Sequence, residues 1–548
     1  MSVTSWHTEI NGSSAQNQPV GEVVMRTART VLEQKIWDRQ QTLEEFAEYV
    51  EVFAREAGEP GTISLRHLHR LAAGRRSSGQ PLGPVRPVTA RLLEKIFRTS
   101  IHDLLAEPSA AGSAGNGVGK LDVRGNVDLA DMADWLDERA GWSPGESRAK
   151  VHAKLATFEA GTLVDRRYRR AKASREQIVR ALRAYYRRGV AGYDMYRVRC
   201  GGEDVRTSIL ARPEWLAHSA SLTAENDRLV LAGRRDGSRA GLSEAAAEAA
   251  VARLAEWAAL DVRVMNLPLY RLLSVDVGSA IGGTVGLVDF AEYALTADLL
   301  EGELVDAVAT GAEPGALPLR REFLPSLEAV LDLPGRVCAG GVLALCAIAR
   351  PRDPYRGAPD YALLVQERSG HVLNTSGRLA VVPKGFHQPL TDVRADAPVS
   401  ATLLRELEEE LFGRDEVDTT MGEGRAASPM HPGRWSEPMR WLRDDPRRMP
   451  MECTGFGLNL VSGNYEFASL VVIEDEEFWT RFGGAIESNW EASGLRLYSS
   501  LDEELIADLV THESWSNEGL FALLQGLRRL AEIGGRRVRL PAVEVSGL

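Results

Sequence analysis

The sequence predicts a multidomain α+β protein. Its 548 residues exceed the length of a typical domain, about 50–250 residues, so several compact regions are expected. Residues 21–108 have the apolar spacing of helices, whereas residues 316–548 alternate short apolar runs with helical segments. Residues 120–312 have mixed and mainly helical patterns. These observations predict an N-terminal helical bundle, a mainly helical middle region and a C-terminal α/β/α sandwich.

The composition excludes several classes of protein. With 44% hydrophobic and 26% charged residues, the chain can form packed cores and is not expected to be disordered throughout. It contains no run of roughly 18 apolar residues, so no membrane span is expected. The polar residues 1–20 favour a flexible tail over a signal peptide. A disulfide framework or structural zinc site is not expected, and a cytoplasmic location is favoured, because the four cysteines lie far apart: Cys200, Cys338, Cys346 and Cys453.

Small residues mark the expected domain boundaries. Residues 109–119 are rich in glycine, serine and alanine, which predicts a flexible linker. A second, weaker boundary lies at 313–315, where Glu-Pro-Gly occurs. The expected organisation is therefore a tail at 1–20, a helical domain at 21–108, a linker at 109–119, a middle region at 120–312 and a C-terminal domain at 316–548.

The helical domain at 21–108 contains several helix start and stop signals. Thr42 followed by Glu45 is a capping box, in which each side chain binds a free N–H at a helix start. Ser64 can cap a second helix, which ends before Gly74. Two further helices are expected at 88–97 and 101–105. Together these signals predict a bundle of short helices joined by tight turns.

Positive charge gathers around the second of these helices. Between residues 66 and 98 there are eight Lys and Arg residues and one acidic residue, Glu94, although the net charge of the chain is −12. The helix at 64–73 turns its leucines inward, which leaves its arginines and histidines on more exposed sides. Arginine can donate two hydrogen bonds to guanine, and arginines in the following turn can contact phosphates. The candidate DNA-contacting residues are Arg66, His67, His69, Arg70, Arg75 and Arg76.

These segments resemble the Xre-type helix-turn-helix family. The resemblance is carried by TLEEFAEYV at 42–50 and ISLRHLHRLAAG at 63–74, followed by RLLEKIF at 91–97 and IHDLL at 101–105. It covers about residues 21–108 and implies double-stranded DNA as a partner. A homodimer is also expected, because helix-turn-helix domains commonly bind two half-sites as dimers. The alternative is a protein-interaction module whose arginines form a solvated face.

The remaining elements are predicted from apolar patterns. In the middle region we expect helices at 128–140, 146–158, 174–188 and 243–260, and a hairpin at 196–200 and 205–211. The C-terminal domain is expected to contain strands at 342–349, 361–366, 378–382, 457–461 and 467–473, and helices at 399–411 and 516–531. A second basic run at 165–188 could support a DNA surface, bind an acidic partner or remain solvated.

The helix expected at 399–411 carries three glutamates on one face. Glu406, Glu409 and Glu410 stand at positions i, i+3 and i+4, while leucines occupy the opposite face. Close like charges repel each other unless a cation lies among them, and Mg²⁺ prefers carboxylate oxygens. These three residues are therefore the candidate metal ligands, with Mg²⁺ as the candidate cofactor. The alternative is an ordinary exposed helix face.

The sequence RELEEE at 405–410 resembles the core of the Nudix box, Arg-Glu-aliphatic-x-Glu-Glu. The flanking strands and the closing helix follow the family order over about residues 340–535. The resemblance implies a Nudix-like α/β/α sandwich, and in active members these glutamates hold Mg²⁺ at a diphosphate. The box is degenerate here, because Thr391, Ala397 and Phe412 stand where the family has Gly, Glu and Gly. We therefore expect a ligand-binding domain rather than an enzyme, and assign no catalytic residues.

The two resemblances together predict a DNA-binding transcriptional regulator whose C-terminal Nudix-like domain senses a small phosphorylated metabolite. One alternative is an Mg²⁺-dependent Nudix hydrolase of a nucleoside-diphosphate-linked substrate with an accessory helical domain. A third hypothesis is a scaffold that binds only other proteins.

Overall fold

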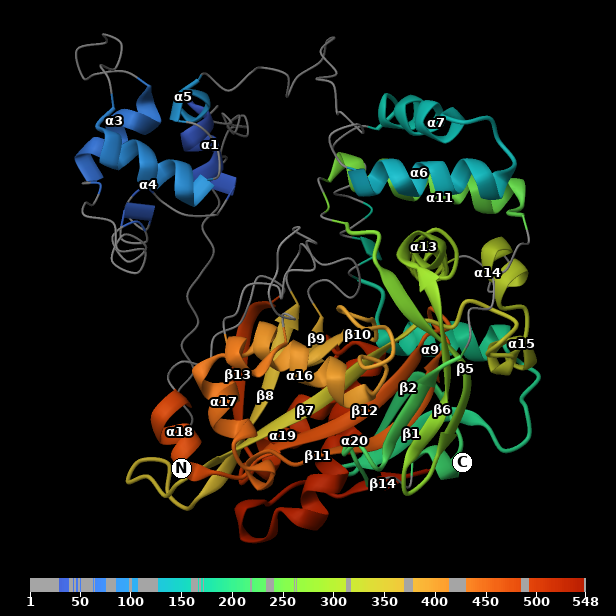
Figure 1. The fold of residues 1–548 in the computed structure, drawn as a ribbon, viewed down its shortest axis with the longest axis vertical. Coiled ribbons are helices and arrows are strands. Elements are labelled where there is room, and N and C mark those ends of the chain that lie inside the picture. The colour runs from blue at the N-terminus through green and yellow to red at the C-terminus, as the bar shows by residue number, and fades with distance from the viewer. Residues whose placement is uncertain are drawn as a thin grey trace, which may run out of the picture. The chain divides into compact units, whose positions relative to one another are not determined.

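The structure is a computed structural model (Figure 1). It describes residues 29–38, 43, 46–47, 50, 63, 65–74, 85–97, 101–106, 127–158, 166, 169–170, 172–216, 219–232, 241–260, 262, 264–311, 317–368, 378–412, 430–483 and 492–546. The predicted tail at 1–20 and the predicted linker at 109–119 lie outside these residues. The chain forms two compact units, residues 1–119 and residues 120–548. The mixed α+β class predicted from the sequence is confirmed.

The N-terminal unit is a bundle of short helices around one apolar core. Its described helices are α1 (Val31–Asp38), α3 (Leu65–Ala73), α4 (Pro87–Phe97) and α5 (Ile101–Leu104). The helices share a core because each contributes apolar residues at helical spacing. The core contains Leu32, Ile36, Phe46, Val50, Ile63, Leu68, Leu71, Leu92, Leu93 and Leu104.

Local interactions fix the end of α3 and the start of α1. Gly74 follows α3 in the left-handed conformation with φ 66°, which is typical of a residue that ends a helix. A Cβ atom at Gly74 would lie 2.9 Å from Cγ2 of Thr30, so glycine is also required for packing. The hydroxyl of Thr30 donates to the Ala72 carbonyl at 2.9 Å, which ties the start of α1 to the end of α3.

The larger unit is built on an 11-stranded mixed sheet of described residues. The strand order is β13-β8-β7-β12-β11-β2-β1-β14, while β10 pairs with β7, β3 with β11 and β9 with β8. The central pair β7 and β12 is parallel and the other neighbouring pairs are antiparallel. The strands are β1 (Asp194–Cys200), β2 (Glu203–Ala211), β3 (Ala220–Ser221), β7 (Gly340–Arg350), β8 (Asp360–Arg368), β9 (Leu379–Val381), β10 (Lys384–Phe386), β11 (Met451–Asn459), β12 (Tyr465–Ile473), β13 (Ala492–Ser499) and β14 (Val543–Val545).

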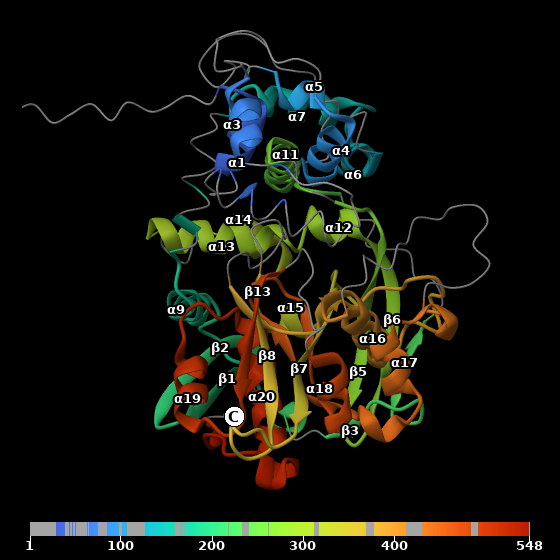
Figure 2. The ribbon, with the colours of Figure 1, turned by 90° about the vertical axis from the view of Figure 1, so that its left-hand side faces the viewer.

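Helices cover both faces of this sheet. Alternate residues of a strand point to opposite faces, and β7 is buried on both. On one face, Val342, Ala344 and Cys346 share a core with the leucines of α16 (Val399–Glu410). On the other, Leu343, Leu345 and Ala347 pack with α20 (Asn517–Ile533). This places α16 and α20 in separate layers, which can be followed in Figure 2.

A second sheet and a group of helices complete the larger unit. The sheet has the order β4-β6-β5, with β4 (Asp227–Leu231), β5 (Pro268–Val277) and β6 (Ile281–Asp289). The remaining described helices are α6 (Val127–Ala140), α7 (Glu146–Leu155), α9 (Arg175–Tyr185), α10 (Pro213–Leu216), α11 (Glu244–Ala259), α12 (Phe290–Ala294), α13 (Leu299–Thr310), α14 (Pro318–Phe323), α15 (Leu327–Leu331), α17 (Glu437–Arg443), α18 (Glu476–Phe482) and α19 (Glu503–Thr511), with 3-10 turns η1 (Pro432–Arg434), η2 (Pro446–Arg448) and η4 (Gly535–Arg537).

The predicted boundary at 313–315 does not divide the chain into separate units. Strands β1 and β2 precede that boundary, yet β2 pairs with β11 and β1 pairs with β14. The side chain of Arg320 is fully buried and donates to the backbone carbonyls of Leu300, Leu460 and Val461. Residues from both sides of 313–315 therefore share one sheet and one hydrogen-bond network, which is why 120–548 forms a single compact unit.

Candidate functional site

Helix α3 in the N-terminal unit has two different sides. Leu68, Leu71 and Ala72 are buried in the core, whereas His69 and Arg70 are exposed. This division follows from the helical period of 3.6 residues, which places the three apolar side chains on one side. The predicted orientation of the helix is therefore observed at these positions, and α3 presents basic side chains to solvent.

One pair of side chains on α3 is held together. The guanidinium of Arg70 lies 3.0 Å from Nδ1 of His67, three residues earlier. Because arginine can only donate a hydrogen bond, Nδ1 of His67 accepts it, and the imidazole is neutral in this arrangement. Partial burial lowers the pKa of His67, and the positive charges of Arg70 and Arg86 lower it further. This contact joins His67 and Arg70 on the same side of α3.

The structure describes only part of the predicted DNA-contacting set. The side chain of Arg66 lies outside the described residues, as do Arg75 and Arg76. Arg86, which our sequence reasoning did not include, is exposed and close enough to His67 to affect its pKa. Arg86 belongs to the basic run at 66–98, and this was the feature of the sequence that could have identified it.

Helix α16 carries the predicted carboxylates, and a residue of the small sheet holds its first turn. Pro398 stands at the N-cap, where it offers no side-chain acceptor. Asp227 of β4 fills this role from outside the helix, because its carboxylate accepts from Val399 N at 3.0 Å and from Ser400 N at 2.8 Å. Burial raises the pKa of Asp227, and the hydrogen bonds from Ser400 and Val399 oppose that shift.

The glutamates of α16 make contacts with protein groups. Both oxygens of Glu410 accept hydrogen bonds, one from Nε2 of Gln366 at 3.0 Å and one from Lys384 N at 2.7 Å. Glu406 lies 2.8 Å from the guanidinium of Arg405. A Cβ atom on Gly385 would lie 2.0 Å from Oε1 of Glu406, so the glycine lets β10 approach this carboxylate. Glu406 and Glu410 therefore both face β10.

These contacts bear on the predicted metal site. Glu406 and Glu410 are buried and Glu409 is half-buried. Among the described residues, no three His, Cys, Asp or Glu side chains converge as they would around a metal ion. Both oxygens of Glu410 already accept hydrogen bonds from protein groups. No observation here tests Mg²⁺ binding at Glu406, Glu409 and Glu410, so it stays a prediction.

A buried ionic cluster lies on the opposite side of β10. Nζ of Lys384 is 2.7 Å from Oε1 of Glu518, at the start of α20, and Asn459 donates to the other oxygen of Glu518 at 3.4 Å. Burial favours a raised pKa for Glu518, but Lys384 outweighs this effect and the pKa is lowered. Burial raises the pKa of Glu301 to about 7, and it raises that of Glu466 well above the usual range.

We refer to Lys384, Glu518, Glu466 and Glu301 as the buried ionic cluster. Its members come from β10, α20, β12 and α13, and sequence reasoning did not find them because they are far apart along the chain. Strongly shifted pKa values occur both at functional sites and in structural ion-pair networks. Here Lys384 and Glu518 form the ion pair, and the charges of Glu301 and Glu466 interact with that pair.

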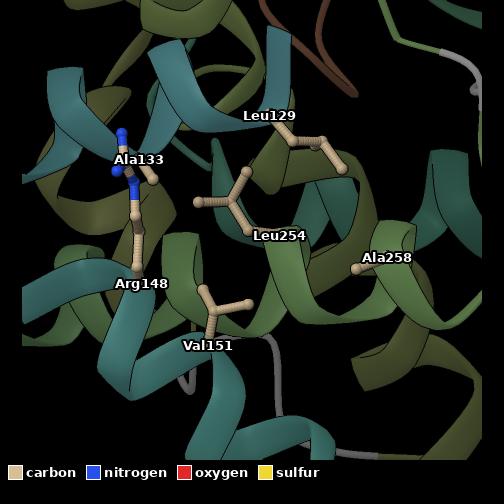
Figure 3. A pocket seen from close by; sticks show the side chains of 6 residues that line it. All are labelled: Leu129, Ala133, Arg148, Val151, Leu254 and Ala258. Atoms are coloured by element: carbon tan, nitrogen blue, oxygen red, sulfur yellow. The ribbon is translucent and has the colours of Figure 1, made fainter. Parts of the chain in front are cut away.

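Figure 3 shows a small apolar cavity between α6, α7 and α11. Five of its six lining residues are apolar, and the sixth, Arg148, is paired with Asp134 at 2.6 Å. Ligand sites usually combine an apolar lining with several convergent polar groups, and this cavity lacks them. It is a gap in helix packing, lined by Leu129, Ala133, Arg148, Val151, Leu254 and Ala258.

Two general properties of the chain also follow from the structure. All four cysteines are buried thiols without disulfide bonds. Of the helices in the described part of the chain, none combines the length and the apolar composition needed to cross a bilayer.

Comparison with known proteins adds no family assignment. No family model matches the sequence, and no curated protein is significantly similar to it.

Proposed function

We propose that this chain is a DNA-binding transcriptional regulator whose larger unit binds a small phosphorylated metabolite. The observation that supports DNA binding most strongly is the two-sided character of α3. Its leucines are buried in the N-terminal core, while Arg70 and His69 are exposed in a protein whose net charge is −12. An acidic protein binds nucleic acid only through such a locally basic surface.

The chemistry of Arg70 suits contact with a duplex. A helix of nine residues is about 13 Å long and can enter the major groove. A guanidinium can bind guanine or a phosphate with two hydrogen bonds. The contact with His67 already restricts the Arg70 side chain, which reduces the conformational entropy that Arg70 loses on binding. We propose Arg70 as a base or phosphate contact and His67 as its positioning residue, with Arg66, His69, Arg75 and Arg76 as further contacts.

Substitution of Arg70 by alanine is expected to weaken duplex binding by the full chain about 5- to 150-fold if Arg70 reads a base, which corresponds to about 1–3 kcal/mol. If Arg70 contacts a phosphate instead, the slope of log K against log salt is expected to fall by about one. The measurement is fluorescence anisotropy with labelled duplexes selected from a pool of promoter fragments. Arg447→Ala is the matched control, because Arg447 is exposed, lies in the larger unit and changes the net charge equally. Equal binding by Arg70→Ala and wild type would reject α3 as the reading helix.

The ligand-binding part of the proposal rests on the resemblance of residues 405–410 to the Nudix box. Binding of a ligand to the folded chain alone raises its stability by RT ln(1 + [L]/Kd), about 2.7 kcal/mol at a concentration of 100 Kd. We therefore expect one class of nucleoside-diphosphate-linked compounds, tested with Mg²⁺, to raise the melting temperature of the full chain. Product analysis of the same mixtures distinguishes the hydrolase alternative. Turnover that Glu409→Gln abolishes would replace the sensor by an enzyme, and no shift with any compound would reject the ligand.

A further inference from the structure

The larger unit contains a second basic surface that the proposed function leaves unexplained. Residues 172–212 include ten Lys and Arg residues and only four acidic residues. This stretch contains α9 and the β1–β2 hairpin, and Figure 2 shows α9 at the periphery of the larger unit beside β2. Local reversal of charge in an acidic protein is the electrostatic mark of a surface that meets a polyanion.

The arginines of the run at 165–188 divide into two groups. Arg166 and Arg170 are used inside the fold, because both bind the carboxylate of Asp306, at 2.5 Å and 2.6 Å, and both lie within 3.7 Å of Glu256. Arg175 is also buried, and its guanidinium donates to a backbone carbonyl at 2.5 Å. These contacts tie the three arginines to neighbouring elements of the fold.

The second group points outward. Helix α9 packs Ile178, Val179 and Leu182 into the core of the larger unit. Arg180 and Arg183 stand three positions apart on the exposed side of the same helix. Directly after the helix, Arg187 and Arg188 are exposed as well.

Only part of this exposed charge is explained by contacts within the protein. The Nε of Arg187 donates to the Ala184 carbonyl at 3.0 Å, a favourable role for a cation at a helix C-terminus. Arg183 lies 3.7 Å from Asp194, but both side chains are exposed, so the pair is screened and weak. Within the described residues, no carboxylate lies within 4 Å of Arg180 or Arg188, although the charge of Arg188 contributes to the lowered pKa of the exposed Glu328. We call Arg180, Arg183 and Arg188 the α9 arginines.

We infer that the α9 arginines form a second surface for duplex DNA, which contacts the phosphate backbone. Guanidinium groups bind phosphates and carboxylates alike with two hydrogen bonds, so the choice of DNA over an acidic protein follows from the DNA contact proposed for α3. Arg180 and Arg183 stand three residues apart on α9, which places both on one exposed side. The inference rests on the proposed function, because a second contact joined to α3 in one chain would raise overall affinity without new sequence reading.

The test compares full-length variants on one DNA. The triple variant R180Q/R183Q/R188Q removes three charges and leaves the helix-capping Arg187 in place. Its matched control is R440Q/R443Q/R447Q, which removes three exposed charges elsewhere on the larger unit. The probe is a labelled random-sequence duplex of 40 base pairs, with anisotropy titrations between 50 and 300 mM salt.

We expect the triple variant to bind roughly 10- to 100-fold more weakly near 0.1 M salt, and its salt slope to fall by about two to three, while the control changes little. Equal affinity and slope for the triple variant and wild type would overturn the inference, and so would an equal loss in the control. If the wild type binds polyglutamate but no duplex through these arginines, the partner is an acidic protein and the inference is also wrong.

The failure of the inference can be distinguished from the failure of the proposed function. If Arg70→Ala weakens binding while the triple variant does not, α3 alone contacts DNA and the proposed function stands. If the wild type binds no duplex at any salt concentration tested, both fail. If the triple variant weakens binding while Arg70→Ala does not, the α9 arginines are the DNA surface and α3 is not.

Discussion

Replacement of Arg320 by methionine is expected to lower the free energy of unfolding by about 3–5 kcal/mol, because several buried acceptors lose a charged donor at once. Arg320 is fully buried, and its guanidinium donates to the carbonyls of Leu300, Leu460 and Val461 and to the hydroxyl of Tyr186. Methionine fills similar space but donates no hydrogen bond, so buried acceptors lose their partner. An unsatisfied buried acceptor costs about 1–3 kcal/mol.

The measurement is urea unfolding of the full chain, followed by tryptophan fluorescence. Arg321→Met is the matched control, because Arg321 is adjacent in α14 but exposed, and a change within about 0.5 kcal/mol is expected there. A transition midpoint for Arg320→Met equal to that of the wild type would show that α14 does not depend on these bonds.

Substitution of Lys384 by methionine is expected to destabilise the chain by about 3–5 kcal/mol at pH 8 and by clearly less at pH 5. Lys384 is the cation of the buried ionic cluster, where it pairs with Glu518 at 2.7 Å near Glu466 and Glu301. Without it, the charge of Glu518 is buried without a cationic partner. At low pH, the unpaired carboxyl can take up a proton and lose its charge.

The pH dependence follows from the direction of each pKa shift. Lys384 lowers the pKa of Glu518. The stabilisation that this ion pair provides is therefore present at pH values above the usual glutamate pKa and is lost as the pH falls. The contribution of Glu301 to stability depends on pH in the opposite direction. Its pKa is raised to about 7 in the folded state, so its contribution is complete below about pH 4.5 and is lost as the pH rises through 7. Removal of the cation affects both carboxylates most strongly at high pH.

Urea unfolding at pH 5 and pH 8 measures this effect, with Lys150→Met as a control at a partly exposed ion pair. The double variant K384M/E518Q is expected to recover part of the loss at pH 8, because it removes the unpaired charge. Equal destabilisation at both pH values, or strictly additive effects in the double variant, would contradict the assigned pairing.

Local patterns in the sequence predicted many elements well. The helix expected at 399–411 corresponds to α16 (Val399–Glu410), and the closing helix expected at 516–531 corresponds to α20 (Asn517–Ile533). The strand expected at 342–349 lies within β7. These elements have caps, apolar stripes or apolar runs that are visible within a short window. In contrast, β5 and β6 were not predicted, although they form most of the small sheet.

Long-range contacts could not be predicted in the same way. The exposed side of α3 follows from helical spacing, so Arg70 and His69 were found from the sequence. The buried ionic cluster joins positions 301, 384, 466 and 518, and no local pattern connects them. The predicted boundary at 313–315 rested on Pro and Gly composition, whereas the pairing of β2 with β11 depends on contacts about 250 residues apart along the chain.

The capping of α16 by Asp227 has a mechanical consequence. The N–H groups of Val399 and Ser400, at the start of this helix, donate to the carboxylate of Asp227. Asp227 lies 172 and 173 positions earlier in the sequence, on β4 of the small sheet. A shift of β4 would therefore be transmitted to the first turn of α16 and, through the helix, to the hydrogen bond that Lys384 N donates to the Glu410 carboxylate. The small sheet is thus coupled to the carboxylate helix through Asp227 and, through the hydrogen bonds that Tyr270 N and Leu272 N donate to the carbonyls of His387 and Cys338, to the segments that flank β10 and β7.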